Sequence, residues 1–153
     1  MTSKRRRVRY TDPRALAAVS ASKAEIAGSK SGPFTLVTVG QLWGGIAVGE
    51  TPDPKMIGVQ QDAALAALHG TGPRDVIEGM LAAQMVSTHN AAMECFRRAN
   101  LPDQTFEGRR MALEFANKLV RSYAALVEAL NRHRGKGQQK GKRCSDLTFC
   151  GVA

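Results

Sequence analysis

The chain has 153 residues, of which 43% are hydrophobic and only 5% aromatic, which predicts one domain with a thin core. Its formal net charge of +9 is concentrated at the two ends. Residues 1–14 carry six Lys/Arg against one Asp, residues 132–143 carry six and no acid, and the rest of the chain sums to −2. The body between the ends is therefore close to neutral.

Cysteine content and hydropathy argue against a disulfide-rich secreted protein and against an integral membrane protein. The three cysteines, Cys95, Cys144 and Cys150, form neither a paired framework nor a CxxC motif, which favours a reducing compartment. The longest uncharged stretch, residues 31–49, contains five glycines and one proline and is a poor apolar helix. We therefore expect a cytoplasmic protein with no integral membrane association.

Residues 1–52 are predicted to be a largely flexible basic region with little regular structure. Asp12-Pro13 is typical of a helix start, and a weak helix over 13–27 is expected to follow. Its few large apolar side chains suggest that this helix forms only when docked.

The next segment is glycine-rich and has β character. FTLVTV at 34–39 is rich in β-branched residues and predicts a strand, which GGIAV at 44–48 could pair with as a small hairpin. Trp43, in the link between them, either packs this segment against the helices or anchors a partner protein. The sequence does not decide between these two roles.

A helical domain is predicted over residues 53–134, and the fold class is mainly α. A shorter helix over 54–69 precedes two long amphipathic helices over 74–99 and 105–133, which a short loop joins. Long helices joined in this way are antiparallel neighbours, so the two form a helical hairpin. Apolar side chains at helical spacing predict its interface, namely Leu81, Met85, Phe96, Leu113, Val120, Tyr123, Val127 and Leu130.

Residues 135–153 lack apolar periodicity and are predicted to be a disordered basic tail. Clusters of Lys and Arg bind phosphate groups by releasing counterions, whatever the base sequence. The predicted phosphate contacts are the basic residues of the two ends, Lys4, Arg5, Arg6, Arg7, Arg9, Arg132, Arg134 and Lys136. Arg97, Arg98, Arg109 and Arg110 form a further basic spot beside the inter-helix loop.

No motif predicts catalysis, a cofactor or a metal. The glycines at 135 and 141 lack the spacing and the Lys-Ser/Thr of a phosphate-binding loop. The three histidines, His69, His89 and His133, are far apart and have no metal-binding spacing. Catalysis nevertheless remains a hypothesis, ranked below the two given at the end of this section, because a catalytic site can be assembled from residues that are distant in sequence.

The segments EGMLAAQMVSTHNAAMECFRRANLPDQTFEGRR and KLVRSYAALVEALNRHRGKGQQK carry a resemblance. Over about residues 30–140 the chain resembles a group of small uncharacterised alphaproteobacterial proteins. The resemblance implies a bacterial cytosolic protein and supplies no activity.

Two functional hypotheses follow from the sequence. The first is a non-enzymatic accessory protein whose basic ends contact nucleic acid nonspecifically. The alternative is a helical protein–protein interaction or self-association module, a homo-oligomer or a partner of another protein, whose tails serve solubility.

Overall fold

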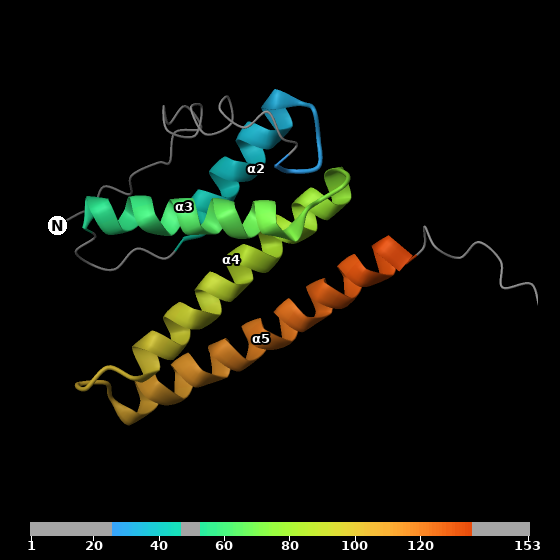
Figure 1. Cartoon of the computed structure of the whole chain (residues 1–153). Helices are drawn as coiled ribbons and strands as arrows, with labels where there is room; N and C mark the ends of the chain where they lie inside the picture. The colour runs from blue at the N-terminus through green and yellow to red at the C-terminus, as the bar shows by residue number, and fades with distance from the viewer. Residues whose placement is uncertain (1–25, 47–52, 136–153) are drawn as a thin grey trace, which may run out of the picture.

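The computed structural model describes residues 26–46 and 53–135 of the chain (Figure 1). Within these ranges the protein is helical and contains no strand. The helices are α2 (Gly32–Gly44), α3 (Pro54–Thr71), α4 (Val76–Ala99) and α5 (Phe106–Gly135). None of them is long and apolar enough to span a bilayer. The predicted helix over 13–27 lies outside the described residues, except that residues 26 and 27 form part of a turn.

The predicted strand over 34–39, and the hairpin that would contain it, are wrong. These residues belong to α2, whose first turn is set by Ser31 as N-cap and Pro33. The Thr35 hydroxyl donates to the Ser31 carbonyl at 3.1 Å, so a β-branched residue is accommodated within the helix. The buried side chains of α2 recur at helical spacing; they are Thr35, Thr38, Val39, Leu42 and Trp43. Burial of this face outweighs the weak local β preference.

Three helices and the turn before them form the core. Ile26 joins the buried side chains of α2, α3 and α4 in one cluster, which consists of Ile26, Leu42, Ala64, Leu68, Ala82 and Val86. Trp43 is 8% exposed, and its indole N–H donates to the Gln61 carbonyl at 3.2 Å. Trp43 therefore packs α2 onto α3 and is not a surface anchor. The helical core begins before residue 53, because α2 belongs to it.

The turn at residues 26–28 is pressed against the start of α4. A Cβ atom at Gly79 would overlap the Ala27 carbonyl, and one at Gly28 would overlap the Asp75 backbone. Gly28 also has a φ of +70°, a conformation that suits glycine. The close approach fixes the N-terminal half of α4 against the core.

The predicted hairpin is confirmed, with α5 running beside α4 for most of its length (Figure 1). Thr105 is the N-cap of α5, since its hydroxyl oxygen accepts a hydrogen bond from Gly108 N at 3.0 Å. Among the four described helices, α4 alone packs along α5. Consequently α5 contributes only two fully buried side chains, Ala116 and Leu130.

Candidate functional site

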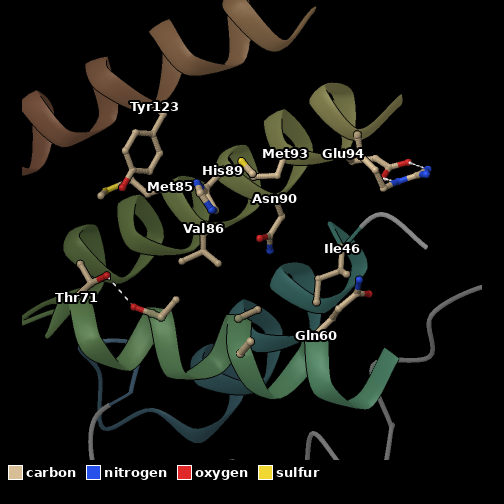
Figure 2. A pocket seen from close by; sticks show the side chains of 14 residues that line it. Ile46, Gln60, Thr71, Met85, Val86, His89, Asn90, Met93, Glu94 and Tyr123 are labelled. Carbon is tan, nitrogen blue, oxygen red and sulfur yellow. Dashed lines mark hydrogen bonds and ion pairs between the residues drawn. The ribbon is translucent and has the colours of Figure 1, made fainter. Parts of the chain in front are cut away.

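A groove lies between α3 and α4 (Figure 2). These two helices diverge from the turn that joins them (Figure 1). Its volume is about 580 Å³. The α3 wall consists largely of small residues, Ala63, Ala64 and Ala67, and their short side chains leave the space open. The α4 wall carries Met85, Val86, His89, Asn90, Met93, Glu94 and Arg97. Tyr123 reaches the groove from α5, so three helices border it.

The polar groups of the groove do not form a catalytic set. The His89 ring packs against Tyr123 with a centroid distance of 6.1 Å. Glu94 is bonded to Arg97 at 2.7 Å and to Arg98 at 2.8 Å, and chiefly the Arg97 hydrogen bond lowers its pKa to about 2. The Thr71 hydroxyl donates to the Ala67 carbonyl at 3.0 Å. The Glu94 carboxylate and the Thr71 hydroxyl are therefore already hydrogen-bonded within the protein. The groove is better suited to binding an apolar surface than to transferring protons.

On α5, the side chains that are buried in the seam with α4 are shifted by about one residue from the interface that the periodicity predicts. Ala116 and Leu130 are buried in the seam as the periodicity requires. The positions beside them that turn inward are the half-buried Ala112, Leu119 and Leu126. On α4, Met85 is buried and Leu81 and Phe96 are half-buried, while Val127 is half-buried on α5. Of the other predicted interface residues, Leu113, Val120 and Tyr123 are exposed.

The rotation leaves a row of apolar side chains exposed along α5. Phe106, Leu113 and Val120 are 83%, 41% and 46% exposed, and we refer to these three residues as the α5 stripe. Their spacing of seven residues places them on one side of the helix, two turns apart. Tyr123, 36% exposed, lines the groove and follows Val120 of the stripe by three residues. The stripe and the groove are thus neighbouring apolar surfaces.

A cluster of charged side chains ties the end of α5 to the start of α4. His133 Nε2 lies 2.7 Å from a carboxylate oxygen of Asp75, the N-cap of α4. Arg134 donates to Glu78 at 3.0 Å and to the Thr71 carbonyl at 2.9 Å. The hydrogen bond with Arg134 lowers the pKa of Glu78, which is only 2% exposed, although burial opposes the shift. We refer to Asp75, Glu78, His133 and Arg134 as the end clamp.

The end clamp contains three side chains that could together hold a metal ion, Asp75, Glu78 and His133. Their potential ligand atoms all lie within 4.8 Å of one another. However, the Arg134 guanidinium already bonds to Glu78, and Asp75 accepts from the Glu78 N–H at 2.9 Å. A divalent cation here would face a fixed positive charge and carboxylates with other partners. The geometry is that of a clamp between helices.

The structure describes two of the predicted phosphate contacts. Arg132 is exposed, whereas Arg134 is bonded within the end clamp. The others lie outside the described residues, namely Lys4, Arg5, Arg6, Arg7, Arg9 and Lys136. At the hairpin tip, Arg97 and Arg98 share Glu94, and Arg110 bonds to Glu107 and Glu114. These ion pairs offset much of the positive charge expected beside the loop.

Sequence reasoning did not identify the groove or the end clamp. Asp75-x-x-Glu78 has the spacing of a capping box and could have marked the start of α4. No local signal connects Glu78 with Arg134, which are 56 residues apart. The groove depends on the angle between α3 and α4, which side-chain periodicity does not specify. Comparison of the chain with family models, with curated proteins and with solved structures finds no match.

Proposed function

We propose that the protein is a helical self-association module whose α4–α5 hairpin pairs with a second copy through the α5 stripe. The exposure of the α5 stripe is the observation that carries this proposal. Single exposed apolar residues are ordinary on protein surfaces, but a row at heptad spacing is typical of a helix-packing surface. Phe106, at 83% exposure, is the most exposed large apolar side chain of the described residues.

The packing of α5 also supports self-association. Although α5 contacts α4 along most of its length, this helix of 30 residues buries only Ala116 and Leu130, so much of its surface is left exposed. Two antiparallel hairpins that join along such faces build a four-helix arrangement with an enclosed core. A second copy would supply a covering surface that the described residues do not provide.

Sedimentation of the full-length chain over a wide concentration range tests this proposal. We expect the wild-type chain to form dimers and Leu113→Glu to sediment as a monomer, because a carboxylate in an apolar interface must be desolvated. Ala125→Glu is the matched control, since it places the same charge at an exposed α5 position away from the stripe. A wild-type chain that remains monomeric, or equal effects of the two substitutions, would contradict the proposal.

Nonspecific nucleic-acid binding through the basic ends is the second proposal. The +5 and +6 charges of residues 1–14 and 132–143 favour it. Titration with a generic duplex at low and at raised salt tests it, and binding should weaken steeply as salt is added. Absence of binding at low salt would refute this proposal without affecting self-association.

A further inference from the structure

The α5 stripe alone is too small to hold a stable dimer. Its three side chains offer roughly 300 Å² of exposed apolar area if a complete aromatic side chain has about 200 Å², given exposures of 83%, 41% and 46%. Each partner in a stable interface buries about 800 Å². A dimer that uses the stripe therefore needs a second apolar surface on each copy.

The groove between α3 and α4 is the neighbouring surface of suitable character. Tyr123 lines the groove and follows Val120 by one helical turn, so the groove and the stripe are continuous around it. Met93, which lines the groove, is 53% exposed and has no cover within the described residues. Figure 2 shows Tyr123 projecting from α5 toward Met85 and His89 of α4.

The dimensions of the two surfaces agree. At 1.5 Å per residue, the stripe from Phe106 to Val120 is about 21 Å long and the α4 wall from Met85 to Arg97 is about 18 Å long. On the opposite wall, the short side chains of Ala63 and Ala67 permit a helix from another copy of the chain to approach closely. A helix carrying the stripe therefore fits the length of the groove.

We infer that the groove of each copy receives the α5 stripe of the other. The dimer then has two equivalent stripe-in-groove contacts related by a two-fold axis. Each copy contributes both surfaces, which roughly doubles the apolar area it buries and approaches the area of a stable interface. This inference rests on the proposed self-association and specifies its geometry.

Substitutions in the groove test the inference on the full-length chain. Ala67→Glu places a carboxylate in the groove at an exposed position, and Ala66→Glu places it on the same helix outside the groove. We expect Ala67→Glu to sediment as a monomer and Ala66→Glu to form dimers like the wild-type chain. Ala63→Glu, one turn earlier on the same wall, replaces Ala67→Glu if circular dichroism shows that the latter loses its helices.

A mixing experiment distinguishes this geometry from direct pairing of two α5 helices. Ala67→Glu retains an intact stripe and Leu113→Glu an intact groove, so the two variants together can form one complete contact. Because only one of the two contacts is complete, we expect the mixture to associate more weakly than the wild-type chain but more tightly than either variant alone. A mixture whose average sedimentation mass equals that of the separate variants at the highest concentration would overturn the inference.

The remaining outcomes separate failure of the inference from failure of the proposed function. If Ala67→Glu forms dimers as well as the wild-type chain while Leu113→Glu does not, the groove is not the docking site but self-association stands. A monomeric wild-type chain would overturn both. If Ala67→Glu also lowers the Tm of that monomer more than Ala66→Glu does, the chain's own residues 1–25 become the candidate occupant.

Discussion

Arg134 and Glu78 form an ion pair of 3.0 Å that closes the hairpin at the end opposite its loop. Glu78 lies in the first turn of α4 and Arg134 in the last turn of α5. The same guanidinium nitrogen lies 2.9 Å from the Thr71 carbonyl and 3.2 Å from that of Gly72, at the end of α3. One side chain therefore holds α5 against both α4 and α3, where the positive charge also suits the C-terminal end of the α3 dipole.

Replacement of Arg134 by Met is expected to lower the free energy of unfolding by about 1–3 kcal/mol. The substitution leaves the buried Glu78 carboxylate without its cation, while methionine preserves part of the apolar stem. Urea unfolding followed by circular dichroism measures the change. Arg132→Met is the control, because Arg132 is exposed and two residues away, and it should change stability by less than about 0.5 kcal/mol. Equal losses in the two variants would show that the ion pair contributes little.

Stability is expected to fall in acid because the carboxyl groups bonded to arginine and histidine have lowered pKa values. The pKa of Glu94 falls from 4.5 to about 2, chiefly through the hydrogen bond from Arg97. A lowered folded-state pKa adds stability above the unfolded value, and that stability is lost as pH drops from about 4.5 toward 2. Glu78 and Asp75 shift in the same direction.

Glu94→Gln isolates the contribution of Glu94 to this acid sensitivity. Thermal unfolding from pH 7 to pH 2 should show a smaller loss of stability for the variant than for the wild-type chain. At pH 7 the variant should lose less than about 1 kcal/mol, since Arg97 and Arg98 are more than half exposed and water screens the pairs. Parallel pH profiles for the two proteins would refute the assignment.

Local patterns were sufficient to predict three of the four described helices. Helices expected over 54–69, 74–99 and 105–133 are observed as α3, α4 and α5 with small shifts at their ends. Their periodicity is clear because charged residues occupy the opposite faces. In α2 the buried face includes Thr35 and Thr38, and threonine in a sequence indicates a polar position or a strand. Counting threonine among the buried residues would have revealed the helical spacing.

The tertiary features of the candidate site were beyond prediction for a different reason. The partners in the end clamp are more than fifty residues apart, so only the folded hairpin brings them together. Leu113 and Val120 of the α5 stripe were predicted as part of the hairpin interface, yet both are exposed. The predicted and the observed packing differ by a rotation of α5 about its own axis by about one residue. Two adjacent heptad positions on α5 are both apolar, and the sequence does not specify which one faces α4.

Trp43 should report directly on the packing of α2. It is the only tryptophan, is 8% exposed and donates a hydrogen bond to the Gln61 carbonyl. Its fluorescence should be protected from a water-soluble quencher in the folded protein and should shift to the red on unfolding. Trp43→Phe should lower the free energy of unfolding by about 1 kcal/mol or more, through loss of the hydrogen bond and ring area. Efficient quenching in the native protein would contradict this packing.

The close approach of the turn at residues 26–28 to α4 predicts opposite effects for two glycine substitutions. Gly79→Ala should destabilise the protein by about 2 kcal/mol despite the better helix propensity of alanine, because the new methyl group would overlap the Ala27 carbonyl. Gly70→Ala, in α3, should instead stabilise it by about 0.5–1 kcal/mol, since that position is exposed and has open space around it. Urea unfolding of both variants measures the difference. A stabilising Gly79→Ala would mean that the turn can move away from α4 without cost, because the propensity gain would then be the only remaining effect.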